Sequence, residues 1–142
     1  MTNRKVLLAL FTTVLIICNT IILTQAANTR SSQYLYDYAS YIDSDVNGDV
    51  YVSFEVTGRS TMDKIGASII YLYEKAPGAS SWTLVKTFIP QYHPEMMGYN
   101  LDFYTNYVSY DGNSNNNYKA TVTISAEKDD GGDSRIIYTN IL

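Results

Sequence analysis

The chain has 142 residues, with 14 acidic and 10 basic side chains and a formal net charge of −4 at pH 7. It contains no cluster of basic residues, which argues against nucleic-acid binding and against electrostatic adhesion to anionic lipid. The single cysteine, Cys18, lies in the leader described next, so we expect no disulfide and no thiol chemistry in the mature protein.

The first 26 residues have the three parts of an export signal. Asn3-Arg4-Lys5 is a positively charged start, Val6 to Ile17 is almost wholly apolar, and Thr24-Gln25-Ala26 places small residues where a signal peptidase cuts. We expect residues 1–26 to be removed and the mature protein to be secreted or associated with the cell surface. The alternative is a retained membrane anchor, because Val6 to Leu23 approaches the length that crosses a bilayer. An exported domain without disulfides is more typical of bacterial export than of a eukaryotic secretory route.

The remaining chain, about 115 residues, has the size of one domain. We expect a flexible start at residues 27–32 and a single domain over residues 33–142. Apolar and polar side chains alternate with a period of two almost throughout, and no helical stripe is present. The fold class is therefore all-β.

Two strands are expected at the start of the domain. The opening strand is predicted over Gln33–Ile42, with Tyr34, Tyr36 and Tyr38 on one face. The clearest strand is Asp49–Arg59, in which every even-numbered residue from 50 to 56 is apolar. This alternation predicts one face in the core and one in solvent.

The later strands are separated by turns or loops rich in glycine, proline, serine and asparagine. They are predicted at Ile65–Lys75, Trp82–Ile89, Tyr99–Tyr110, Tyr118–Ala126 and Ser134–Leu142. We expect a hairpin between the first two of these and a bulge near Asn106. The total is about seven strands at the spacing of an antiparallel β-sandwich.

Three segments resemble parts of a fibronectin type III domain. Tyr71-Leu72-Tyr73-Glu74 before a turn and Trp82-Thr83-Leu84-Val85 after it look like its third and fourth strands. Tyr118 enters the penultimate strand just after a loop and resembles the tyrosine of a tyrosine corner, whose hydroxyl ties the loop down. The resemblance implies an immunoglobulin-like sandwich and brings no activity.

Other segments are similar to small exported proteins of unknown function from clostridial-type Gram-positive bacteria. These segments are Met62–Ala67, Trp82, Tyr118–Val122 and Gly132–Arg135. What this similarity implies is an exported sandwich of a Gram-positive cell.

A short acidic segment matches part of a calcium-binding loop. Residues 43–48 read D-S-D-V-N-G and fit the first six positions of the D-x-D-x-N-G pattern, with Asp43, Asp45 and Asn47 as oxygen ligands. However, Phe54 stands where the bidentate acid belongs, and a strand follows instead of a helix. The alternative is a hairpin turn at Asn47-Gly48. We therefore expect no cofactor, and Ca²⁺ is the one ion that the pattern leaves open.

The sequence lacks the signatures of an enzyme. His93 is the only histidine, and there is no G-x-S-x-G elbow, no paired zinc ligands and no glycine-rich phosphate loop. We therefore expect no catalysis. A hydrolase or toxin would need His93 to meet a carboxylate and a hydroxyl in one cleft.

The aromatic side chains are the candidate binding residues. The chain has 14 tyrosines and one tryptophan, and exposed aromatic rings stack well on the apolar face of a sugar. Trp82 with Tyr71, Tyr73 or Tyr51 forms the candidate platform. The alternative is that these rings fill the core, since alternation alone does not say which face is wet.

The sequence therefore leaves two hypotheses for the function. The first is an exported, non-catalytic module that binds a cell-wall glycan or a surface protein. The second is a structural or stress-protective extracellular protein with no specific ligand, in which the tyrosines serve packing.

Overall fold

The computed structural model describes residues 32–142. The expected export signal, residues 1–26, and residues 27–31 of the expected flexible start lie outside the described residues. Within the described part, no helix is long and apolar enough to cross a membrane.

Antiparallel strands make up most of residues 32–142, as the period of two predicted. The strands are β1 (Leu35–Ser44), β2 (Val50–Lys75), β3 (Thr83–Phe88), β4 (Met97–Tyr110), β5 (Asn117–Lys128) and β6 (Gly131–Tyr138). A short 3-10 turn, η1 (Pro94–Met96), precedes β4. The described part has six strands instead of about seven, because the strands expected at Asp49–Arg59 and Ile65–Lys75 are one continuous strand, β2.

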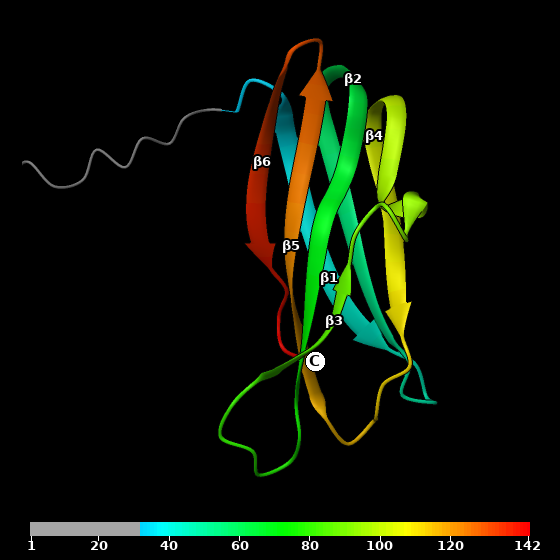
Figure 1. The fold of residues 1–142 in the computed structure, drawn as a ribbon, viewed down its shortest axis with the longest axis vertical. Helices are drawn as coiled ribbons and strands as arrows, with labels where there is room; N and C mark the ends of the chain where they lie inside the picture. The colour runs from blue at the N-terminus through cyan, green and yellow to red at the C-terminus, as the bar shows by residue number, and fades with distance from the viewer. Residues whose placement is uncertain (1–31) are drawn as a thin grey trace, which may run out of the picture. The chain divides into compact units, whose positions relative to one another are not determined.

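The long strand β2 organises the sheet, since it pairs with four other strands. Its first half, residues 50–57, lies between β1 and β4. Its second half pairs with β4 over residues 62–66, with β5 from residue 64 onward and with β3 near its end. β6 extends the sheet beyond β5. Between the two halves the pairing with β4 shifts at Thr57 and Met62, and Figure 1 shows β2 turning back on itself there.

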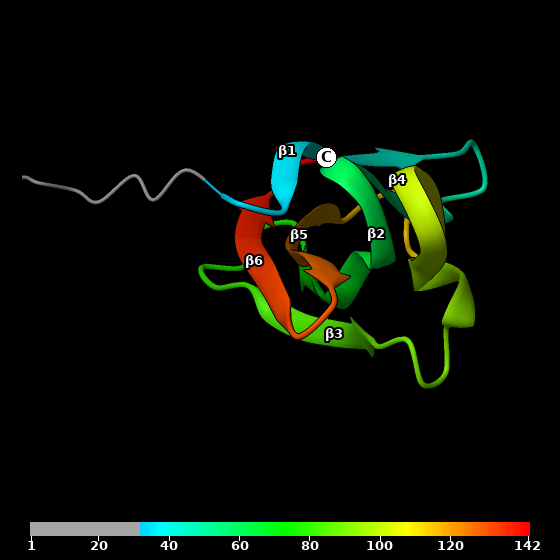
Figure 2. The ribbon, with the colours of Figure 1, turned by 90° about the horizontal axis from the view of Figure 1, so that it is seen from above.

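The core lies between the two halves of this folded sheet. The even-numbered residues from Val50 to Val56 are at most 1% exposed, as the alternation predicted. They form one cluster with apolar residues of the second half of β2 and of β5, among them Ile65, Ile70, Leu72, Val122 and Ile124. Seen from above, the strands surround this interior (Figure 2). The odd-numbered residues of the first half of β2 point away from the core and form an outer face.

A bulge in β1 overturns the expectation that three tyrosines share one face. The register of β1 shifts between Leu35 and Asp37. As a result Tyr36 is 70% exposed, whereas Tyr34 and Tyr38 pack against the core. One extra residue reverses the alternation, and the sequence pattern carries no sign of it.

Two later strands, β4 and β6, also differ from expectation. Asn106 pairs in register with Phe54, and the irregularity in the pairing of β2 with β4 lies instead between Thr57 and Met62 of β2. The last strand begins at Gly131 and ends at Tyr138. Beyond it, the N–H groups of residues 139 and 142 still donate to carbonyl groups of β5.

Candidate functional site

The candidate site lies on the outer face of the second half of β2. Ile70 and Leu72 are fully buried, so the alternating Tyr71 and Tyr73 point to the opposite side of the sheet. Both tyrosines are half-buried. Trp82 stands just before β3, which pairs with this part of β2. Three of the four predicted aromatic residues therefore come from neighbouring strands.

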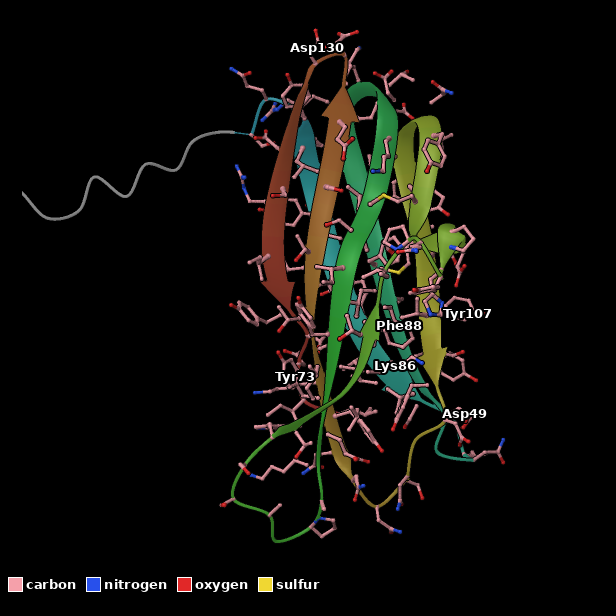
Figure 3. The ribbon with its side chains drawn as sticks, in the orientation of Figure 1. Asp49, Tyr73, Lys86, Phe88, Tyr107 and Asp130 are labelled. Atoms are coloured by element: carbon pink, nitrogen blue, oxygen red, sulfur yellow. The ribbon has the colours of Figure 1, made fainter. Side chains whose placement is uncertain are left out.

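Residues of β2, β5 and β6, together with Trp82, line a cavity, which we call the aromatic hollow. Its volume is about 260 Å³. Its lining residues are Tyr73, Trp82, Lys119, Ala120, Thr121, Tyr138 and Thr139. Tyr73 is labelled in Figure 3, beside the lower part of β5. Neither tyrosine of the hollow is buried in the core, since Tyr73 is half-buried and Tyr138 is 76% exposed.

A lysine stands at the centre of the aromatic hollow. Lys119 on β5 pairs directly with Tyr73 on β2. Its Nζ lies 4.6 Å from the ring centroid of Trp82 and 5.9 Å from that of Tyr73. Both distances are in the range of a cation–π contact. Lys119 thus contacts both rings from one position.

Tyr71 extends the hollow by one row along the sheet. It pairs with Thr121 of β5, and Thr121 pairs in turn with Tyr138 of β6. On its other side Tyr71 pairs with Thr87 of β3. Across the sheet this row therefore alternates threonine and tyrosine, in the order Thr87, Tyr71, Thr121 and Tyr138.

The hollow also carries polar groups that make no hydrogen bond within residues 32–142. These are the hydroxyls of Tyr73, Thr121 and Tyr138, the indole N–H of Trp82 and the ammonium of Lys119. By contrast, the Thr139 hydroxyl donates to the carbonyl of Asn140 at 2.9 Å. A ligand with hydroxyl groups thus meets several free donors and acceptors beside the rings.

Tyr51, the fourth predicted residue, does not belong to the hollow. It lies on the first half of β2, where its ring meets that of Tyr107 edge to face at 5.8 Å. Burial raises the pKa of Tyr51, and the carboxylates of Asp45 and Asp49 raise it further. Figure 3 shows Tyr107 and Tyr73 on opposite sides of the molecule. The platform is therefore built from Trp82, Tyr73 and Tyr71 without Tyr51.

The predicted calcium ligands form a turn. The Asp45 carboxylate accepts hydrogen bonds from the backbone N–H groups of Asn47 at 2.9 Å and Asp49 at 3.0 Å. Against the opposing effect of burial, these bonds lower the pKa of Asp45. The Asp43 carboxylate accepts from the N–H of Ser44 at 2.8 Å. Within residues 32–142, no group of three or more His, Cys, Asp or Glu side chains is placed to hold a metal ion.

The geometry of this turn corrects its expected position. The Gly48 N–H donates to the Asp45 carbonyl at 3.2 Å, and Gly48 has a φ of +98°. The turn is thus centred on Val46-Asn47 rather than on Asn47-Gly48. A left-handed glycine after such a turn is the usual form of a three-residue hairpin loop.

His93 has one of the two partners that catalysis would require. Its Nδ1 lies 3.1 Å from the Glu95 carboxylate, and its ring packs edge to face on Phe88 at 5.0 Å. The hydrogen bond from its own backbone N–H to the Glu95 carboxylate lowers the pKa of Glu95, and the contact with His93 lowers it further, against the opposing effect of burial. Within the described residues, no hydroxyl is hydrogen-bonded to His93.

A second, polar cavity of about 260 Å³ was not predicted from the sequence. It lies among loop residues and is lined by Ser44, Gly48, Asn113, Ser114, Asn116, Asn117, Tyr118 and Leu142. The expected role of Tyr118 is confirmed here, because its hydroxyl accepts from the N–H of Asn113 at 2.7 Å. The same hydroxyl donates to the Glu74 carboxylate at 2.6 Å.

No protein-family model, no curated protein and no solved structure matches the chain. The function is therefore argued from the site alone. The sequence pointed to Trp82, Tyr71 and Tyr73, but not to Lys119 and Tyr138. The alternation of side chains along their strands indicates that Lys119 and Tyr138 point outward. The register that brings them near Trp82 follows only from the strand pairing.

Proposed function

We propose that this chain is an exported, non-catalytic bacterial module that binds a cell-surface glycan in the aromatic hollow. The observation that carries the proposal is the convergence of Trp82, Tyr73 and Tyr138 on one outer face. Free hydroxyl and indole donors surround these rings. The export signal over residues 1–26 and a Gram-positive origin belong to the same proposal.

The chemistry of the hollow suits a sugar better than a purely apolar ligand. A pyranose has one apolar face that stacks on an aromatic ring, and its edge carries hydroxyl groups that need partners. The rings of Tyr73 and Trp82 are half-buried, so binding costs little additional side-chain entropy. The volume of about 260 Å³ lies below the 300–1,000 Å³ typical of drug-sized sites and fits a single sugar unit of a longer chain.

The fold that we propose around this site is an immunoglobulin-like β-sandwich of the fibronectin type III kind. Support comes from the way both halves of β2 contribute to one core. It also comes from Tyr118, whose hydroxyl accepts from a backbone N–H five residues upstream, as in a tyrosine corner. Such sandwiches present loops and sheet faces on a stable scaffold, which suits a binding module.

A structural or stress-protective role without a ligand is the second candidate. One observation favours it, namely that Lys119 already contacts the rings of Trp82 and Tyr73. In this role the hollow is a packing arrangement that needs no further partner. The two functions differ in whether Tyr138, which is 76% exposed, contributes to any binding.

An array of bacterial cell-wall glycans tests the proposal with the secreted protein, purified from the medium of an expressing Gram-positive host. We expect retention on wall glycans, and a loss of affinity of tenfold or more in Trp82→Ala and in Tyr138→Ala. Stacking of one ring is worth roughly 0.5–1.5 kcal/mol beyond its buried area, and tenfold corresponds to about 1.4 kcal/mol.

Tyr92→Ala is the matched control, because Tyr92 is 73% exposed and lies outside the hollow. It should bind as the unchanged protein does. If the unchanged protein binds no wall glycan, or if Tyr138→Ala and Tyr92→Ala bind equally, the role of the hollow as a glycan site is refuted. Circular dichroism of each variant verifies that the fold is kept.

A further inference from the structure

We infer that the aromatic hollow selects glycans that carry a negative charge, a carboxylate or a phosphate, and that Lys119 is its main contact. The inference rests on the proposed glycan function and adds the chemical class of the ligand. It comes from the placement of two lysines at a single tryptophan.

Two ammonium groups approach the same ring. The Nζ of Lys119 lies 4.6 Å from the ring centroid of Trp82, and the Nζ of Lys75 lies 5.9 Å from it. Lys75 is two residues from Tyr73 on β2, and Tyr73 pairs with Lys119 on β5. The two lysines are therefore diagonal neighbours on one face of the sheet. Their charges repel one another, and an anion between them would relieve that repulsion.

Neither lysine is neutralised by the protein. Within residues 32–142, neither Lys75 nor Lys119 forms an ion pair, and no acidic residue lines the hollow. The chain as a whole has more acidic than basic side chains, 14 against 10. Two unpaired cations beside one ring therefore stand out against an acidic background.

The contact with Trp82 leaves the ammonium groups able to bind an anion. An ammonium has three N–H donors, and neither Lys75 nor Lys119 donates a hydrogen bond within the described residues. A carboxylate or phosphate oxygen would accept such a bond while the ring keeps the cation in place. Charge-assisted bonds of this kind are the strong ones.

Matched acidic and neutral sugars test the inference by calorimetric titration of the full chain. One pair is an oligogalacturonate and its methyl ester. The other pair is a phosphomannan and the same mannan after treatment with phosphatase. We expect at least one acidic form to bind about tenfold more tightly than its neutral partner, and the pair that shows the difference tells carboxylate from phosphate. The difference should narrow at 0.5 M salt, since salt screens exposed charges.

The variant Lys119→Gln removes the charge and keeps most of the side chain. It should bind acidic and neutral forms equally, whereas Lys86→Gln should keep the preference. Lys86 is the matched control, because its Nζ lies 5.9 Å from the Phe88 ring and outside the hollow. Figure 3 labels both residues of this control pair on β3.

The outcomes separate the inference from the function on which it rests. Equal binding of acidic and neutral forms by the unchanged protein refutes the charge selection and leaves the glycan site intact. A preference that survives in Lys119→Gln refutes the role of Lys119. If the protein binds neither these sugars nor any glycan on the wall array, both the inference and the proposed function are refuted.

Discussion

At the scale of single residues, Tyr118 joins the core to the polar loop after β4. Its ring is 1% exposed and belongs to the core cluster. Its hydroxyl accepts from Asn113 and donates to Glu74. Burial and the bond to the Glu74 carboxylate raise the pKa of Tyr118.

We predict that Tyr118→Phe destabilises the protein by about 1–3 kcal/mol. The ring and its packing remain, whereas the Asn113 N–H and the Glu74 carboxylate each lose a hydrogen-bond partner. Urea unfolding measures the cost. Tyr110→Phe is the control, because the Tyr110 ring lies 6.3 Å from that of Tyr118 but its hydroxyl makes no hydrogen bond within residues 32–142. Equal stability of the two variants would contradict the role of the Tyr118 hydroxyl.

The sequence predicted half of this arrangement. The position of Tyr118 just after the polar loop suggested that its hydroxyl holds the loop. Glu74 was out of reach of such reasoning, since it lies 44 positions away and meets Tyr118 only through the pairing of β2 with β5. The same pairing brings Lys119 to Tyr73, which is why the lysine of the hollow was missed.

At the scale of elements, the folding of β2 depends on a close approach to the chain before β4. Gly66 has a φ of +151° and pairs with Met97. A Cβ at this position would overlap the carbonyl oxygen of Met96. Both the backbone angle and the space therefore require glycine here.

We predict that Gly66→Ala destabilises the protein more than Gly78→Ala does. Gly78 has a φ of +76°, and a Cβ there would meet nothing within 4 Å. Its substitution should cost about 1 kcal/mol from backbone strain alone, whereas Gly66→Ala adds a steric clash inside the sheet. Thermal unfolding of both variants measures the difference. Equal midpoints would show that β2 and β4 move apart at little cost.

The sequence missed the continuity of β2 for a physical reason. Residues 58–64 break the alternation of the first half, which suggested a loop between two strands. Yet after Gly58 this segment contains no proline, glycine or asparagine, and its turn-prone residues are limited to Ser60 and Asp63. The chain thus stays extended while it changes direction, and pairing with β4 resumes at Met62.

At the scale of the whole molecule, Asp133 connects the two ends of the described chain. Its carboxylate accepts from the Ser32 hydroxyl at 2.5 Å and from the N–H groups of Gln33 at 2.8 Å and Tyr34 at 3.3 Å. The bond from Ser32 is the main cause that lowers the pKa of Asp133 below its ordinary value of 3.8, with burial acting against it. The contacts span 99 to 101 positions in the sequence.

This contact predicts a dependence of stability on pH. A carboxyl group with a lowered pKa stabilises the fold above its ordinary pKa and loses that contribution as the pH falls through the lowered value. Asp133→Asn should therefore be less stable than the unchanged protein at pH 7, and the difference should shrink as the pH falls below 3.8. Urea unfolding at pH 7, 5 and 3 measures the trend. Asp130→Asn, on the turn before β6, is the control, and a difference in stability that stays constant down to pH 3 would contradict the prediction.

The position of the indole has a practical consequence for the study of the site. Trp82 is the only tryptophan in a chain with 14 tyrosines, and it lines the hollow. Excitation at the long-wavelength edge of the near ultraviolet selects this one fluorophore. Any compound that displaces Lys119 from its ring changes the emission, so the protein carries its own optical reporter and needs no attached dye.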